Sequence, residues 1–269
     1  MSNRRGGGIG SYSLTFFLGM TMLAWAGAPD QASAAMFDLT QASSSGGING
    51  ALYQATSTQS AGSGYGAFNA FLKISSNKPV EEGYNTDYRY PSGNGQKSVE
   101  FDQITDHHTR ALKLSALPQV TIGDSSYREF LLDINEPQCK DNFLSLDALQ
   151  IFIGDGPNLH DFSKDRDPNY AWAAHATLIY NMDAGGDNWA KLKDLGGGSG
   201  WADYSVYLRN DLFVGGEYVY LYSKFGENLD NHNGFEEWGV RTTPTPIPGS
   251  VFLLGTGLLG FAGTIRRKN

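Results

Sequence analysis

The stretch Tyr218-Val219-Tyr220-Leu221-Tyr222 has the alternation that decides the fold class. Successive side chains of a β-strand point to opposite faces, so the valine and leucine share one face and the three tyrosines share the other. We expect the Val/Leu face to contact a core and the tyrosines to face outward or toward a partner. The pattern therefore predicts a strand with one face buried.

Short segments of the same kind recur along the chain, and glycine-containing turns separate many of them. The expected strands lie at 48–53, 67–74, 110–117, 120–122, 127–134, 144–153, 173–180, 204–208, 218–223 and 235–240. No helical periodicity of useful length accompanies them, so the crossover helices of a parallel α/β fold are missing. The sequence predicts an all-β chain with an antiparallel β-sandwich or jelly-roll-like domain.

The strand expected at 144–153 changes its alternation partway along. Leu144 and Leu146 lie on one parity, whereas the apolar residues from Leu149 onward lie on the other. One extra residue in a strand reverses the facing of everything after it. We therefore predict a β-bulge at Asp147-Ala148.

The first 35 residues have the order of a secretory signal peptide. Arg4 and Arg5 precede an apolar run at 14–26, and small residues at 32–35 suit cleavage before Met36. An uncleaved anchor is the alternative, although the apolar run is short for a bilayer span. We expect residues 1–35 to direct export and residues 36–243 to form the mature domain.

The last residues, 244–269, combine three features. Prolines at 244, 246 and 248 precede the uncharged apolar run Gly249–Ile265, and Arg266-Arg267-Lys268 follows it. As a helix the run would be about 25 Å long, close to the ~30 Å hydrocarbon core of a bilayer. We expect a transmembrane helix with its basic tip on the cytoplasmic side. A buried C-terminal helix is the alternative, but a core gives the basic tip no role.

This order resembles the PEP-CTERM protein-sorting tail of Gram-negative bacteria, with Pro246, Ile247, Pro248 and Gly249 at the motif position and Arg266, Arg267 and Lys268 at the tip. The resemblance implies recognition by a membrane-embedded exosortase, cleavage near the prolines, and a link to exopolysaccharide and biofilm. Ile247 replaces the motif's central glutamate, which leaves the processing position open. The second half of the chain is also similar to PEP-CTERM proteins whose bodies have uncharacterised function.

The charge balance excludes some partners. The 269-residue chain carries 20 Lys and Arg against 28 Asp and Glu, for a net charge of −8. Loss of both ends would remove five basic residues and one acid, leaving a domain of about −12. Such a domain is unsuited to nucleic acid or anionic lipid and compatible with cations. Its single cysteine, Cys139, cannot form an intrachain disulfide, and pairing between molecules stays open.

The loop Asn181-Met-Asp183-Ala-Gly-Gly-Asp187-Asn188 is a candidate calcium site. Calcium prefers six to eight oxygen ligands from carboxylates, amides and carbonyls, and Asn181, Asp183 and Asp187 could supply three. The loop is not an EF-hand, because Leu192 stands where the twelfth-position glutamate is needed. The alternative is a plain turn, since Asp, Asn and Gly are the usual turn residues. Similar clusters occur at 155–169 and 228–237.

Aromatic residues suggest glycan binding as a second possibility. Trp172, Trp189, Trp201 and Trp238, with the tyrosines, could stack on sugar rings. The alternative is that these residues pack within and between strands.

Motifs for catalysis are missing from the sequence, so we predict a protein that is not an enzyme. Glu236 and Glu237 are adjacent, so on a strand they point to opposite faces and cannot form a glycosidase pair alone. The histidines lack the spacing of common zinc sites, and no nucleophile elbow or phosphate loop occurs.

The sequence thus predicts an exported, exosortase-sorted protein at the cell surface or in the extracellular matrix, with a non-catalytic structural or binding role and extracellular polysaccharide as the expected contact. The alternative is a calcium-dependent carbohydrate-binding module. A secreted glycan-active enzyme is the third reading.

Overall fold

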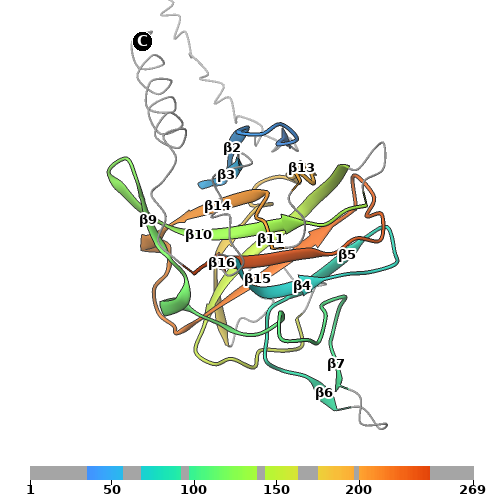
Figure 1. Ribbon diagram of the computed structural model, residues 1–269. Coiled ribbons are helices and arrows are strands. Elements are labelled where there is room, and N and C mark those ends of the chain that lie inside the picture. The colour runs from blue at the N-terminus through green and yellow to red at the C-terminus, as the bar shows by residue number, and fades with distance from the viewer. Residues whose placement is uncertain are drawn as a thin grey trace, which may run out of the picture. The chain divides into compact units, whose positions relative to one another are not determined.

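A computed structural model describes residues 35–56, 68–91, 97–137, 143–162, 175–196 and 200–242. These residues contain no α-helix, and the chain is all-β as predicted (Figure 1). Its strands are β1 (Met36–Asp38), β2 (Ser45–Ile48), β3 (Ala51–Ala55), β4 (Phe68–Ile74), β5 (Glu81–Tyr84), β6 (Tyr90–Pro91), β7 (Lys97–Ser98), β8 (Leu112–Lys113), β9 (Gln119–Ile122), β10 (Ser125–Ile134), β11 (Phe143–Gly154), β12 (Ala176–Asn181), β13 (Trp189–Lys193), β14 (Tyr204–Arg209), β15 (Tyr218–Phe225) and β16 (Glu236–Arg241).

Most of these strands belong to two seven-stranded sheets. Sheet A has the order β1-β13-β11-β15-β5, with β12 also pairing β11 and β8 also pairing β15. Sheet B has the order β2-β3-β14-β10-β16-β4, with β9 also pairing β10. The pairings are antiparallel except for β1 with β13, which is parallel. Sheet A is therefore mixed and sheet B is antiparallel, and their arrangement is consistent with a β-sandwich.

A single apolar core joins the inner faces of the two sheets. Sheet A contributes residues such as Leu149, Val219 and Leu221, and sheet B contributes residues such as Leu132 and Trp238. Each of these side chains is almost fully buried. Burial of apolar area at about 25 cal/mol per Å² makes this shared interior the main stabilising contribution.

Polar side chains tie the two sheets together within that interior. Trp238 Nε1 on β16 donates to Ser223 Oγ on β15 at 3.0 Å. The hydroxyl of Tyr204 on β14 donates to the Lys193 carbonyl at 2.8 Å and accepts from the Lys193 amide at 2.8 Å, on β13 of the other sheet. These bonds satisfy buried polar groups and restrict sliding of one sheet over the other.

The predicted bulge in β11 is confirmed. The register of β11 against β15 shifts between Leu146 and Ala148. Because of that shift, leucines on both sides of the bulge, including Leu146 and Leu149, enter the same core. The carboxylate of Asp147, at the bulge, accepts the amides of Glu227 and Asn228 and so holds the loop between β15 and β16.

Two strand predictions are wrong. The single strand expected at 48–53 is instead the hairpin β2–β3, whose turn residues Asn49 and Gly50 have φ of 47° and 88°. Asn-Gly is the usual sequence of a two-residue hairpin turn that needs positive φ. The strand expected at 110–117 is mostly a loop, with β8 followed by a 3₁₀ turn at Leu114–Ala116.

The sequence missed β5 because its inward-facing residues are not apolar. Glu81 pairs with Phe225 and Gly83 pairs with Ser223, so both lie on the core-facing side of sheet A. A strand that carries a glutamate and a glycine on its inner face shows no hydrophobic alternation.

The face assignment of β15 is half right. Val219 and Leu221 face the main core as predicted. On the other face Tyr220 and Tyr222 do not meet solvent or a partner, since they are 0% and 6% exposed. Phe162 covers them from a loop and stacks on Tyr222 with a centroid distance of 4.5 Å.

The predicted ends of the chain lie outside the described residues. This applies to the signal peptide at 1–35, apart from Ala35, and to the sorting helix at 249–265. Among the residues that are described, no helix has the length and apolar character needed to cross a bilayer.

Two glycines test the packing of the loop after β15. Gly226 and Gly215 have nearly the same φ, +90° and +89°, but a Cβ at Gly226 would overlap the Pro79 carbonyl whereas a Cβ at Gly215 would meet nothing. Gly215→Ala should therefore cost about 1 kcal/mol from backbone strain alone. Gly226→Ala should cost about 2 kcal/mol more, because the backbone must move. Urea unfolding of both variants would measure the difference in their free energies of unfolding. Equal losses would contradict the close approach of Gly226 to the Pro79 carbonyl.

Candidate functional site

The outward face of sheet B carries a row of charged side chains. Asp133 on β10 pairs in register with Glu237 on β16, so both carboxylates lie on the same face of the sheet. Lys73 on the neighbouring β4 places Nζ 3.4 Å from Glu237 Oε1. Although this face points away from the core, Asp133 and Glu237 are only 1% and 3% exposed.

Burial governs the protonation of the acids at this end of sheet B. Burial raises the pKa of Asp133 to about 7. The nearby charge of Glu237 also raises this pKa, while a hydrogen bond from the Gly200 amide lowers it. Burial likewise raises the pKa of Asp203 to about 8, and the charge of Asp133 adds to it. Both acids are thus poised to titrate near neutral pH.

A second ion pair lies on the same face, toward the other end of β10. Arg241 donates from Nε and from a terminal nitrogen to the two oxygens of Glu129, at 3.0 Å each. The hydroxyl of Tyr207 also donates to Glu129, at 3.3 Å. A two-point Arg–carboxylate contact of this kind is geometrically specific and satisfies a charge that would otherwise be buried alone.

Two glutamates, Glu81 on β5 and Glu236 on β16, are buried on the inner sides of the sheets. Glu81 is fully buried, and its Oε2 accepts from the Ser76 amide and from Asn231 Nδ2, each at 2.8 Å. Burial raises the pKa of Glu81 to about 8, and the charges of Glu136 and Asp102 add to it. Glu236 shares the inward side of β16 with Trp238 and is also fully buried, and neither of its carboxylate oxygens has a hydrogen-bond partner. Such burial is costly to stability.

Aromatic side chains with accessible surface gather near β6. The ring of Tyr88 stacks on His160 with a centroid distance of 3.8 Å and an interplanar angle of 12°. Tyr90 meets Tyr88 edge-on, with a centroid distance of 4.9 Å, and its hydroxyl donates to Asp161 Oδ1 at 2.7 Å. The side chain of Asp161 is 75% exposed. We call Tyr88, Tyr90, His160 and Asp161 the aromatic ledge; it combines ring surface with an exposed acid.

The predicted calcium loop is an ordered turn. Asn181 Oδ1 accepts from the Asp183 amide and Asp183 Oδ1 accepts from the Asn188 amide, each at 3.0 Å. Burial raises the pKa of Asp183 to about 6, and the charge of the nearby, exposed Asp187 adds to that rise. The three predicted ligands thus belong to one loop, and two of them already use an oxygen within the turn.

The predicted aromatic residues do not form one surface. Trp238 is fully buried in the core, so it is unavailable to a sugar, and the prediction for it is wrong. Trp189 and Trp201 are partly buried in separate parts of the chain. Trp172 and Cys139 lie outside the described residues, as do the sorting residues Pro246, Ile247, Pro248, Gly249, Arg266, Arg267 and Lys268. The aromatic ledge was missed because its members come from separate stretches of sequence.

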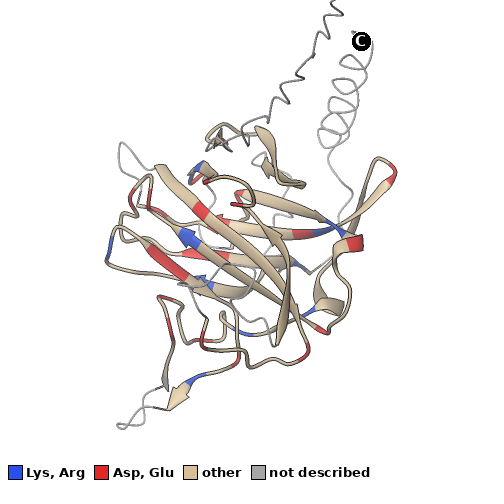
Figure 2. Ribbon diagram, turned by 180° about the vertical axis from the view of Figure 1, so that it is seen from behind, with Lys and Arg blue, Asp and Glu red and all other residues tan. Residues whose placement is uncertain are grey.

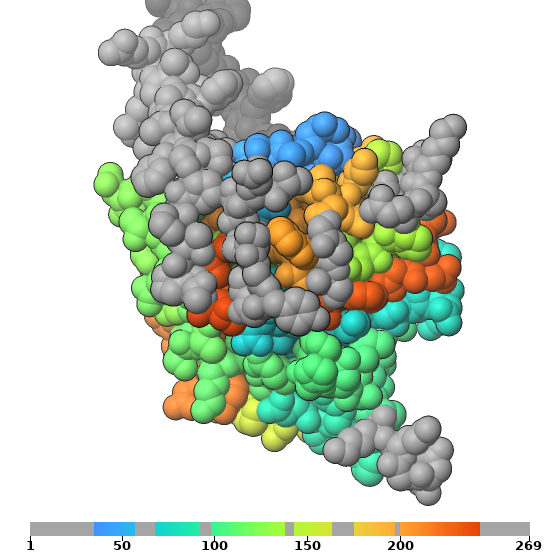
Figure 3. Space-filling model, viewed as in Figure 1, coloured from blue at the N-terminus to red at the C-terminus, as the bar shows by residue number. Residues whose placement is uncertain are grey.

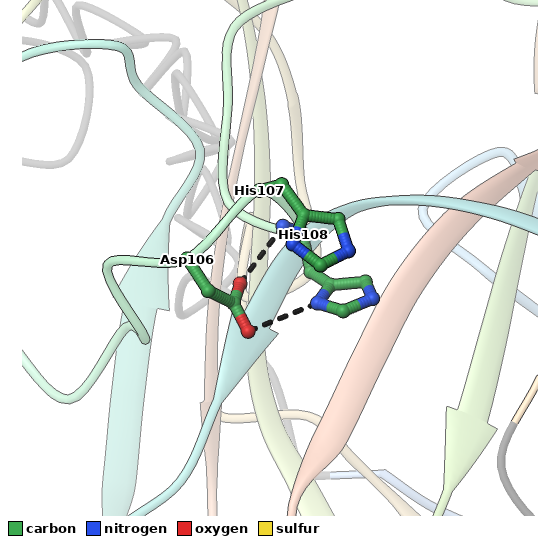
Figure 4. Close-up of side chains that lie close together, drawn as sticks. All are labelled: Asp106, His107 and His108. Atoms are coloured by element: carbon green, nitrogen blue, oxygen red, sulfur yellow. Dashed lines mark hydrogen bonds and ion pairs between the residues drawn. The ribbon is translucent and has the colours of Figure 1, made fainter.

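One group of histidine and acidic side chains in the described part of the chain could hold a metal ion, namely Asp106, His107 and His108 (Figure 4). The sequence analysis did not predict this group, because common zinc sites have spaced ligands and these three residues are consecutive. The run Asp-His-His itself was the available signal.

Charged residues of the two signs are interspersed along the described chain rather than gathered by sign (Figure 2). Acidic residues occur on strands and on connecting loops, with basic residues among them (Figure 2). This distribution offers no extended basic stripe for a nucleic acid backbone on the described residues seen in that view.

Comparisons with known proteins add no identification. No protein-family model matches the chain, and searches of curated proteins and of solved structures found no match.

The buried acids predict a stability that falls as pH rises. The folded pKa of Glu81 is about 8 against an ordinary value of 4.5, so the folded state retains a proton that the unfolded chain loses. Stability from this group is complete below about pH 4.5 and is lost progressively up to about pH 8. Glu81→Gln should reduce the fall in melting temperature between pH 5 and pH 8.5, and the exposed change Glu217→Gln should not. The same pH dependence in both variants would contradict the assignment.

Proposed function

We propose that the chain is an exported protein that an exosortase sorts to the cell surface or the extracellular matrix, where its β domain has a non-catalytic role in contact with polysaccharide. The observation that carries the proposal is the tail: a proline motif at 246–248, an uncharged apolar run at 249–265 and a basic tip at 266–268. A run of that length flanked by basic residues suits a temporary membrane anchor. The apolar run at 14–26, near the start of the chain, suits export of the domain that follows it.

The aromatic ledge supports polysaccharide as the contact. Sugar rings present C–H groups on one face and hydroxyls at their edges, which suit an aromatic ring beside a hydrogen-bonding acid. Tyr88 and Tyr90 supply rings, and Asp161 supplies a carboxylate that is 75% exposed. The hydrogen bond between Tyr90 and Asp161 positions both groups before any ligand arrives.

The burial of the acid row supports a non-catalytic role. Asp133 and Glu237 face the same side, as a glycosidase pair must, but both are nearly inaccessible to solvent. A sugar could not approach within bonding distance of these carboxylates unless the chain that covers them moved. Their contacts with Gly200 and Lys73 fit acids that hold the structure together.

A calcium-dependent carbohydrate-binding module is the second candidate. The favouring observation is that Asp183 and Asp187 interact electrostatically within one loop, with burial and that interaction raising the pKa of Asp183. A bound cation would offset the repulsion between the two carboxylates. This candidate requires glycan binding to depend on calcium.

Sorting can be tested by fractionating cells that express the full chain with and without an exosortase. We expect the chain to stay in the membrane fraction without the enzyme and to be shortened at its C-terminal end with it. Replacing Pro246 and Pro248 by alanine should reduce processing at least tenfold, whereas Pro91→Ala, a control in the domain, should not. Processing that is indifferent to the tail prolines would refute exosortase sorting through this motif.

Polysaccharide binding can be tested with a glycan array, followed by calorimetry on any glycan that binds. Tyr88→Ala should weaken binding about tenfold, equivalent to ~1.4 kcal/mol, because it removes a ring of the aromatic ledge. Tyr127→Ala, on β10 of sheet B and outside the aromatic ledge, is the matched control. Loss of binding in chelator and in Asp183→Asn would favour the calcium-dependent module. Binding unaffected by Tyr88→Ala would reject the ledge as the contact surface.

A further inference from the structure

The segment between β7 and β8 places three metal-ligating side chains together on the surface. Asp106, His107 and His108 each offer one ligand atom, and these atoms all lie within 4.8 Å of one another. The segment, green in Figure 3, is exposed beside the teal residues around β4. The two imidazole rings lie next to each other, with a centroid distance of 3.8 Å and an interplanar angle of 39°.

Hydrogen bonds to β4 hold the backbone on both sides of this group. Before it, the Ile104 amide donates to the Lys73 carbonyl at 2.8 Å. After it, Thr109 Oγ1 accepts from the Lys73 amide at 3.1 Å, and the Arg110 amide donates to the Phe71 carbonyl at 2.9 Å. The turn is therefore anchored to a core strand, which lowers the entropy cost of ordering its side chains around a ligand.

The spacing of two of the donor atoms is close to what a metal ion requires. Asp106 Oδ2 lies 2.9 Å from His108 Nδ1, and Asp106 Oδ1 accepts from the His108 amide at 2.8 Å (Figure 4). Donors of one tetrahedral zinc ion lie about 3.3 Å apart, given a Zn–N distance of about 2.0 Å. With the imidazole proton on Nε2, which neutral histidine allows, Nδ1 can face a cation beside the carboxylate.

We propose that Asp106, His107 and His108 form a surface site for a divalent first-row transition-metal ion such as Zn²⁺. Two imidazoles and one carboxylate are the donor set such ions prefer, whereas calcium prefers oxygen donors alone. The His107 donor lies within 4.8 Å of the other two, and its side chain is accessible, so rotation of the ring can bring it to coordination spacing. Three protein donors leave at least one coordination position open to water or to an external ligand.

This site is independent of the proposed sorting and glycan roles. None of its three residues belongs to the tail, to the aromatic ledge or to the loop at 181–188. A metal ion here would also differ from the calcium of the second candidate function in the chemistry of its ligands.

The test is calorimetric titration of the full chain, purified without a histidine tag, with ZnCl₂ in the presence of millimolar CaCl₂. We expect saturable binding of one Zn²⁺ per chain, with no competition from calcium. Asp106→Asn, His107→Ala and His108→Ala should each weaken binding at least tenfold. The control is His160→Ala, a partly exposed histidine outside the group, and it should bind as the parent does. Absence of binding, or binding that survives the double change at His107 and His108, would overturn the proposal.

A second measurement needs no variant and so remains decisive if a substitution disturbs folding. Diethylpyrocarbonate modifies accessible imidazoles, and mass spectrometry of the unaltered chain maps the modified residues. Zn²⁺ should protect His107 and His108 at least fivefold and leave His160 unchanged. Equal protection of all three, or of none, would refute the site.

Discussion

The interlock of two sheets over one apolar interior is the constraint on which the rest of the molecule depends. Leucines, valines and aromatic rings from both sheets meet there, and hydrogen bonds from Trp238 and Tyr204 cross the interface. Burial of apolar surface stabilises the pair of sheets, and the directed hydrogen bonds set their relative position. The bulge at Leu146–Ala148 is needed for the same reason, since it turns leucines on both sides of it toward the one core.

Buried charged side chains occur both on the outer face of sheet B and in the interior, and they differ in whether they have a partner. A second aromatic cluster covers the outside of β15, where Phe162 stacks on Tyr222. On the outside of sheet B, Glu129 is nearly inaccessible and is matched by Arg241 through two hydrogen bonds. Glu236, in the interior, has no such partner. The fold therefore carries the desolvation cost of an unpartnered polar group at Glu236, which the apolar core must exceed.

The side chains that are accessible to a ligand lie mainly on loops outside the two packed sheets. Apart from Tyr90 on β6, the aromatic ledge comes from segments that join strands, and so does the Asp106–His108 group, whose backbone is held by β4. The acid row on sheet B has the opposite property, since Asp133 and Glu237 are almost fully enclosed. Accessibility rather than residue type thus separates side chains suited to binding from those that stabilise the fold.

Local patterns in the sequence were sufficient for the all-β class, the inward face of β15 and the bulge in β11, because alternation of side chains is a property of neighbouring residues. The tail also rests on sequence alone as a prediction, since its prolines, apolar run and basic tip are contiguous. Only the tertiary structure decided that β5 is a strand, since Glu81 and Gly83 give it no apolar face. It likewise decided that Tyr220 is covered, that Asp133 faces Glu237, and that Tyr88 stacks on His160. Each of those facts joins residues far apart in the chain, and sheet pairing and loop packing, which no local pattern encodes, bring them together.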